Sequence, residues 1–274
     1  MQHNGAVGRD DSYVIRSGVD ALGRLELIAR LFAPATSDLL VRTGAVAADR
    51  FLDVGCGIGD VAVRAAAGGV GEAWGIDVNA DVVAGARARA ERLGSAARFA
   101  VGSFDDLGTE PWTGFDVVST RCVVSHLPDP VPALAALLRA VRPGGLVLVE
   151  DVEVAAVWSS PPEPALDRHV ALYLAAAHGL GACPDVGPRL APTLRVLGAE
   201  VVTVDLVQPL VRDPADLVVH ARTMEAIAGP VVAQGLATGD EVAALVERLE
   251  AWAGEPGVVA SLPRLVQVTG RRPR

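Results

Sequence analysis

The sequence predicts an α/β fold in which helices cover both faces of a mostly parallel sheet of seven strands. Short β-branched segments alternate with Ala-, Leu- and Arg-rich segments of helical length through most of the 274 residues. The strand segments are almost continuously apolar, which indicates burial on both faces of a sheet. The first strand runs directly into a glycine-rich turn and a helix, the order found in nucleotide-binding crossovers.

The expected strands and core helices follow one another along the chain. The strands are 50–54, 73–77, 97–101, 115–120, 145–150, 200–207 and 264–270. The core helices are 60–68, 79–94, 131–142 and 187–198. Asn79 is expected to cap the start of its helix and Gly94 to end it, because these residue types satisfy the free backbone groups at helix ends.

Three regions depart from this alternation and add helices to the sheet. They contain expected helices at 18–32 and 37–44, then at 165–179, and then at 214–229 and 239–254. Added elements of this kind commonly cover the ligand crevice or form oligomer contacts. We therefore expect one domain over 1–274, divided into N-terminal helices (1–46), a core (47–154), an inserted helical cap (155–186) and the C-terminal part of the sheet (187–274), which carries a helical insertion (213–255).

Composition disfavours several classes of function. The net charge of -9 disfavours a nucleic-acid or anionic-membrane partner, and no apolar run approaches the length of about 18 residues that a membrane span needs. All 24 basic residues are arginine, so Schiff-base chemistry, pyridoxal phosphate and a P-loop are excluded. The three cysteines form neither a zinc pattern nor a disulfide framework, and the N-terminus has no signal pattern. We expect a cytoplasmic protein without a bound metal.

The glycine-rich turn lies in 51-FLDVGCGIGD-60 and limits which ligand the first crossover can hold. The dinucleotide fingerprint has a glycine at its sixth position, where this chain has Asp60. A carboxylate at the helix start would repel pyrophosphate, and the turn itself contains no arginine to offset it. The pattern disfavours a dinucleotide without excluding it. It favours an adenosine ligand that has no phosphate and carries positive charge, such as S-adenosylmethionine.

The same run closely resembles the first motif of class I S-adenosylmethionine-dependent methyltransferases, which have a Rossmann-like fold. Further matches follow in the family's order, at 75-GIDVN-79, 101-VGSFDDL-107, 116-DVVSTRCVVSHLPDP-130 and 141-VRPGGLVLVEDVE-153. The resemblance covers roughly residues 45–155. It implies a methyltransferase that uses S-adenosyl-L-methionine as its cofactor.

The resemblance also implies which residues contact the cofactor. Asp53 would meet the methionine ammonium, Asp77 the ribose hydroxyls, and Ser103 the adenine edge. Many relatives have Asp where Ser103 stands, so Asp105 or a backbone carbonyl is the alternative acceptor for the adenine amine. The full predicted set is Asp53, Gly55, Cys56, Gly57, Gly59, Asp77, Val78, Ser103, Phe104, Thr120 and Arg121.

His126 is the candidate catalytic base, because it follows the fourth strand at the edge of the sheet where ligands bind. A structural turn histidine is the alternative, since 126-HLPDP-130 is a common way into a helix. His169 and Tyr173 are four residues apart and share a helix face. The candidate substrate-binding residues are Tyr13, Glu150, His169 and Tyr173, and Tyr13 and Arg24 are candidates to cover the methionine carboxylate.

The predicted function is methyl transfer to oxygen, nitrogen or carbon of a small molecule, of the kind found in secondary metabolism. One alternative is an enzyme of the same fold that binds the cofactor but catalyses a non-methylating step such as cyclisation. Another is a non-catalytic protein that only binds the cofactor. The apolar helices at 165–177 and 240–252 suggest a homodimer, with packing inside one chain as the alternative.

Overall fold

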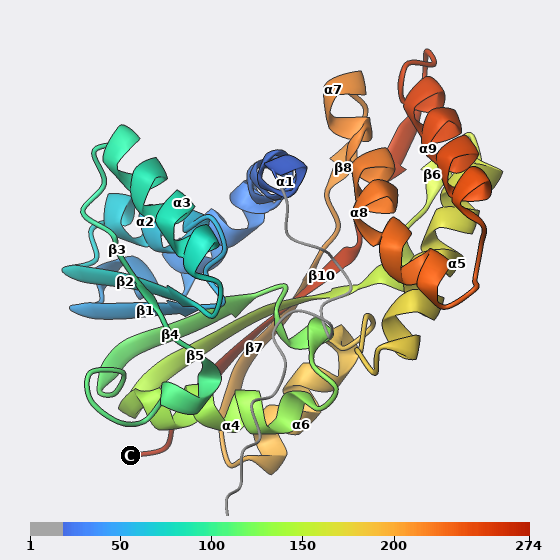
Figure 1. Ribbon diagram of the computed structural model, residues 1–274. Helices are drawn as coiled ribbons and strands as arrows, with labels where there is room; N and C mark the ends of the chain where they lie inside the picture. Colours follow the sequence, from blue (N-terminus) through green and yellow to red (C-terminus); the bar gives the residue numbers. More distant parts are fainter. Residues whose placement is uncertain (1–18) are drawn as a thin grey trace, which may run out of the picture.

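The computed structural model describes residues 19–274 and contains the predicted seven-stranded sheet (Figure 1). The strands lie in the order β3-β2-β1-β4-β5-β10-β7, in which β10 is antiparallel to both β5 and β7. The pairs among β1 to β5 are parallel. The strands are β1 (Arg50–Val54), β2 (Glu72–Asp77), β3 (Arg98–Val101), β4 (Phe115–Arg121), β5 (Val141–Glu153), β7 (Glu200–Val207) and β10 (Arg264–Arg271).

Helices cover both faces of this sheet, as the sequence predicts. Figure 1 shows α2 (Asp60–Gly68) and α3 (Ala80–Arg92) on one face, and α4 (Pro130–Ala140) and α6 (Leu190–Val196) on the other. Asn79 caps α3, because its side chain accepts hydrogen bonds from the N–H groups of Asp81 and Val82. Buried aliphatic side chains fill both interfaces between helices and sheet. The class of fold predicted from the sequence is confirmed.

Several expected boundaries were wrong. One helix, α1 (Val19–Arg42), runs through Pro34 where two helices were expected. A proline removes one backbone hydrogen bond, but the helix buries Phe32, Ala35 and Leu39 on either side of it, so packing holds the two halves in line. The expected helix 131–142 ends at Ala140, because β5 begins at the next residue.

A second, three-stranded sheet was not predicted from sequence. It consists of β6 (Ser159–Ser160), β9 (Val259–Ser261) and β8 (Leu210–Val211), in the order β6-β9-β8. Strands of two or three residues are too short to show an alternating pattern in the sequence. The sheet joins the segment after β5 to the segments that follow β7 and precede β10, and so ties the two helical insertions together.

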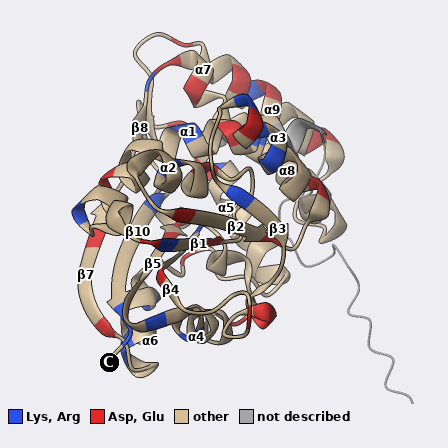
Figure 2. Cartoon of the chain, turned by 90° about the vertical axis from the view of Figure 1, so that its left-hand side faces the viewer, with Lys and Arg blue, Asp and Glu red and all other residues tan. Residues whose placement is uncertain are grey.

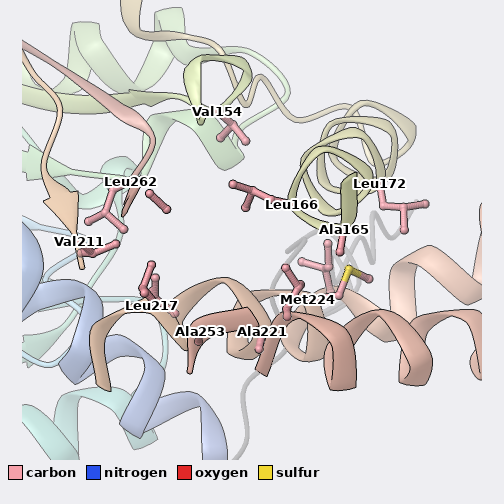
Figure 3. Close-up of a cluster of buried hydrophobic side chains, with 14 of the residues drawn as sticks. Val154, Ala165, Leu166, Leu172, Val211, Leu217, Ala221, Met224, Ala253 and Leu262 are labelled. Atoms are coloured by element: carbon pink, nitrogen blue, oxygen red, sulfur yellow. The ribbon is translucent and has the colours of Figure 1, made fainter. Parts of the chain in front are cut away.

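The two insertions form one helical cap beside the end of the sheet. It consists of α5 (Pro164–Gly179), α7 (Pro214–Leu217), α8 (Val219–Ala233) and α9 (Gly239–Ala253). Its core includes Leu166, Leu172 and Met224, which project from α5 and α8 (Figure 3). The apolar faces of α5 and α9 are therefore used inside this chain, and the homodimer stays a prediction.

Figure 2 marks the charged positions along the chain, and acidic positions occur in the first turns of α7 and α9. Among residues 19–274, no helix has both the length and the apolar character needed to cross a membrane.

Candidate functional site

The glycine loop between β1 and α2 adopts a conformation that side chains other than glycine rarely take. Gly55, Gly57 and Gly59 have φ of 70°, 52° and 77°. A Cβ at Gly55 would lie 2.5 Å from the Val123 side chain, and one at Gly59 would lie 2.4 Å from the Phe99 ring. A Cβ at Gly57 would meet nothing within 4 Å. Two glycines are thus required by packing, and the middle one leaves the loop backbone open.

A cavity of about 240 Å³ lies beside this loop, at the carboxyl edge of the parallel strands. Side chains from α1, from the loop and from the ends of β1, β2 and β4 line it. The predicted cofactor residues that line it are Asp53, Gly55, Cys56, Gly57, Asp77, Val78 and Arg121, and His126 joins them. This combination of fold and loop is typical of nucleotide-binding α/β proteins.

Two carboxylates from adjacent strands face this cavity and have different environments. Asp53 is 1% exposed and its Oδ1 accepts a hydrogen bond of 2.8 Å from Ser119 Oγ. Burial raises the pKa of Asp53 to about 7, against the lowering effect of that hydrogen bond. Asp77 accepts hydrogen bonds of 3.0 Å from the N–H groups of Gly57 and Asn79. Asp77 therefore fixes the loop and the start of the α3 segment.

Asp60 is not the uncompensated negative charge that the sequence indicates. Its carboxylate lies 3.0 Å from Arg64 and 3.2 Å from both Arg89 and Arg121, which come from α2, α3 and β4. Burial acts to raise the pKa of Asp60, but the three guanidinium charges outweigh it and the pKa lies below its ordinary value. The expectation that Asp60 repels pyrophosphate was therefore wrong in its premise, because Arg64 on the same helix and the more distant Arg89 and Arg121 offset the charge.

Four predicted cofactor residues do not line the cavity. Ser103 caps the short helix Phe104–Asp106, where it accepts from the N–H of Asp105 and donates to Asp106. Thr120 is buried and its hydroxyl donates to the carbonyl of Val54, joining β4 to β1. The remaining two are Gly59 and Phe104. Contacts of these residues with a cofactor stay a prediction.

The candidate substrate residue Glu150 is buried and lines neither this cavity nor the second one beneath the cap. Its Oε2 accepts from Gln267 Nε2 at 2.7 Å and from Thr36 Oγ1 at 3.2 Å. The adjacent Asp151, which with Glu150 and Glu153 was expected at the edge where an acceptor binds, accepts from the N–H groups of Val123 and Ser125, each at 3.1 Å. Asp151 thereby fixes the turn that carries His126.

A second cavity, of about 150 Å³, adjoins the first beneath the helical cap. The two cavities share the lining residues Arg24, Leu25, Ile28, Cys122 and His126. Cys122 has a φ of 55°, rare outside glycine, and burial raises the pKa of its thiol. His126 lies in the turn Val124–His126, and burial, together with the charge of Arg24, lowers its pKa to about 4. Its imidazole is neutral at pH 7.

Residues from the cap form the other side of the second cavity. The predicted His169 and Tyr173 line it from α5, and His220 and Thr223 line it from α8. His220 was missed from sequence, because a single histidine in an apolar helix is more often a core residue. Tyr13 lies outside the described residues. Within residues 19–274, no group of three or more His, Cys, Asp or Glu side chains could hold a metal ion.

Comparisons with known proteins find a similarity that covers the cavity-bearing core. Residues 46–172 match the model of the family described as "Methyltransferase domain". A ubiquinone biosynthesis O-methyltransferase of Aromatoleum aromaticum is 30% identical over 119 residues, which are 43% of this chain and 50% of that protein. A ribosomal protein L11 methyltransferase of Ralstonia pickettii is 38% identical over 119 residues, which are 41% of this chain and 37% of that protein. The chain thus spans half or less of the length of these relatives.

The solved structure of a putative methyltransferase from Bacillus halodurans has the same fold. It is 18% identical, has a TM-score of 0.53, and the match covers 82% of this chain and 92% of that one. The core of this chain is thus similar in sequence to methyltransferase domains over residues 46–172 and shares their fold.

Proposed function

We propose that the protein transfers a methyl group from S-adenosylmethionine to a small molecule. The observation that carries this proposal is the pair of adjoining cavities, one beside the glycine loop and one beneath the cap, with His126 and Cys122 at their junction. A cofactor and an acceptor in these two places would meet across the junction. Holding two reactants in contact and in line can supply much of the acceleration of a displacement reaction.

The residues beside the glycine loop fit S-adenosylmethionine. The open side of Gly57 lets the backbone approach a ligand, and the buried carboxylate of Asp53 suits an ammonium group. Asp77, at the end of β2, is placed to accept hydrogen bonds from ribose hydroxyls while it holds the loop. When bound, this cofactor supplies an electrophilic methyl group on a sulfonium.

The second cavity favours a small molecule over a protein as the acceptor. It measures about 150 Å³ and lies between the sheet edge and the cap, with an apolar majority among its lining residues. Water is excluded from such a space more readily than from an open groove, which protects the displacement from competing hydrolysis. That the acceptor belongs to secondary metabolism stays a prediction.

His126 would act on the acceptor as a neutral imidazole. It lines both cavities, so a hydroxyl or amine approaching the cofactor can donate a hydrogen bond to it. Because the pKa of His126 is lowered to about 4, one nitrogen of its ring carries no proton at pH 7. The imidazole can then take the proton that the acceptor group releases during transfer.

Asp77→Ala is expected to weaken the binding of S-adenosylhomocysteine by about 1–3 kcal/mol, because it removes charge-assisted hydrogen bonds to the ribose. Isothermal titration calorimetry measures the loss. Asp81→Ala removes an exposed carboxylate four residues further on and is the control. An unchanged affinity in Asp77→Ala, or a dinucleotide that competes for the same site, would contradict the proposed cofactor role.

His126→Ala is expected to lower kcat on the order of 100-fold, with the affinity for S-adenosylhomocysteine within about twofold of the wild type. His178→Ala removes an exposed histidine and is the control. The pKa of His126 is about 4, so this group stays unprotonated between pH 8 and 5.5. Protonation of His126 should therefore not lower the wild-type kcat at saturating cofactor in this pH range. An acidic limb with an apparent pKa near 6.5 that disappears in His126→Ala would contradict a buried, neutral imidazole.

Product analysis separates this proposal from its alternatives. Formation of S-adenosylhomocysteine, with one methyl group added to the acceptor, is the expected outcome. Conversion of the acceptor without either change would identify a non-methylating enzyme. Cofactor binding without turnover of any member of a broad acceptor panel would favour the non-catalytic alternative.

A further inference from the structure

Two buried histidines lie together in the second cavity, away from the cofactor side. His169 of α5 and His220 of α8 are 5% and 4% exposed, and their ring centroids are 6.1 Å apart. Both line the second cavity and neither lines the first, whereas His126 lines both. The cavity therefore has two polar ends, one at the junction with the cofactor cavity and one at the cap.

The hydrogen bonding of this pair is incomplete within the described part of the chain. Nδ1 of His169 and Nε2 of His220 are buried without a hydrogen-bond partner. Buried polar groups in native proteins are nearly always hydrogen-bonded, so each unsatisfied group calls for an explanation. Trp252 packs with its ring centroid 6.1 Å from that of His220 and offers that ring an apolar neighbour. Because both residues line the cavity, a ligand there would lie beside two imidazoles whose hydrogen bonding the fold leaves incomplete.

The charge of the cavity limits what this ligand can be. Burial lowers the pKa of His169 to about 3 and that of His220 to about 4, so both rings are neutral at pH 7. The described lining residues include no carboxylate that could balance a cation. Their one permanent charge, Arg24, lies at the junction with the cofactor cavity and not at the cap end. A charged group at the cap end would therefore be buried without a counter-charge.

The size of the cavity limits the ligand further. A cavity of about 150 Å³ holds about one benzene-sized ring. Apolar side chains such as Phe32, Val154 and Leu262 provide the walls against which such a ring would pack. A neutral imidazole has one donor and one acceptor nitrogen, and a hydroxyl both donates and accepts. A hydroxyl is thus well matched to two neutral imidazoles.

We propose that His169 and His220 are substrate-binding residues that hydrogen-bond a neutral hydroxyl on a single-ring acceptor, whose second polar group faces His126. The inference rests on the proposed function, because it takes the second cavity as the acceptor site. It adds the class of acceptor: an uncharged ring compound with two hydrogen-bonding groups on opposite sides. The histidines at the cap anchor one group, and the other receives the methyl.

The test uses hydroquinone as a neutral probe, with 4-hydroxybenzoate and 4-(aminomethyl)phenol as anionic and cationic probes of similar size. Binding to the full chain is measured by ligand-observed NMR at pH 7, with saturating S-adenosylhomocysteine. Hydroquinone is expected to bind at least about tenfold more tightly than either charged probe. His220→Phe is expected to weaken hydroquinone binding about tenfold, the loss of one hydrogen bond to a buried group. His220→Gln should restore part of the affinity.

Two controls make the result specific. His178→Phe makes the same change at an exposed position of α5 and should leave hydroquinone binding unchanged. The thermal midpoint of unfolding and the affinity for S-adenosylhomocysteine report whether each variant folds. If His220→Phe does not fold, His169→Phe is used in its place.

Equal binding of a charged probe overturns the inference, as does unchanged hydroquinone affinity in a folded His220→Phe. Either result, with normal binding of S-adenosylhomocysteine, leaves the proposed methyl transfer standing. Failure of the wild type to bind S-adenosylhomocysteine would instead count against the proposed function.

Discussion

Replacing Asp60 with alanine is expected to destabilise the protein by about 3–5 kcal/mol. The carboxylate is 3% exposed and neutralises Arg121, whose side chain is 11% exposed, as well as Arg64 and Arg89. Without Asp60, Arg64 and Arg89 stay partly buried after losing this carboxylate, and Arg121 keeps the attraction of Glu150 but loses its ion-pair partner. Removing one partner of a buried pair costs far more than the pair contributes, because the remaining charge has lost its solvation.

Urea unfolding of wild type and variant measures this loss. Glu72→Ala provides the matched control, because Glu72 also pairs with two arginines, Arg50 and Arg98, but at the surface. A surface pair of this kind contributes about 1 kcal/mol or less. A loss below about 1 kcal/mol in Asp60→Ala would show that water reaches the cluster and screens it.

The affinity of Asp60→Ala for its ligands provides a second, independent measurement. Arg121 lines the cofactor cavity, so loss of Asp60 removes one of the negative charges near Arg121 and makes the site beside the ligand more positive. We expect S-adenosylmethionine, with its sulfonium, to lose more affinity than S-adenosylhomocysteine, which has a neutral sulfur. Equal losses would indicate that the variant acts only through loop geometry.

Replacing Gly59 with alanine is expected to cost about 3 kcal/mol of stability. The residue has a φ of 77°, which an alanine adopts at a cost of about 1–2 kcal/mol. Its new Cβ would lie 2.4 Å from the Phe99 ring and 3.2 Å from the Ala86 Cβ, so the contact between the loop and β3 must open, for about a further 1–3 kcal/mol.

Gly57→Ala separates packing from ligand binding. Gly57 has a φ of 52°, but its Cβ would meet nothing within 4 Å, so only the backbone strain of about 1–2 kcal/mol is expected. Because Gly57 lines the cofactor cavity, its Cβ should weaken binding of S-adenosylhomocysteine more strongly than stability. Equal stability losses in the two variants, measured by urea unfolding, would contradict the packing difference.

The sequence alone determined the sheet and the loop. The seven strands alternate with helices, and local periodicity records this order because each strand is buried on both faces. The glycine positions could be predicted because a turn with positive φ limits the residue type. The side chains at the ends of β1, β2 and β4 could be predicted to lie at one site, because the carboxyl ends of parallel strands share one edge of the sheet.

Only the tertiary structure decided which distant side chains meet. Arg89 and Arg121 lie on α3 and β4, and nothing in their spacing shows that they converge on Asp60, whereas Arg64 is four residues from Asp60 on the same helix. His169 and His220 are 51 residues apart, yet the packing of α5 on α8 brings their rings together. Periodicity records which face of an element is buried, and not what that face is buried against. The compensation of buried charges and the polarity of the cavity depend on which residues pack against each other. They could therefore be found only in the tertiary structure.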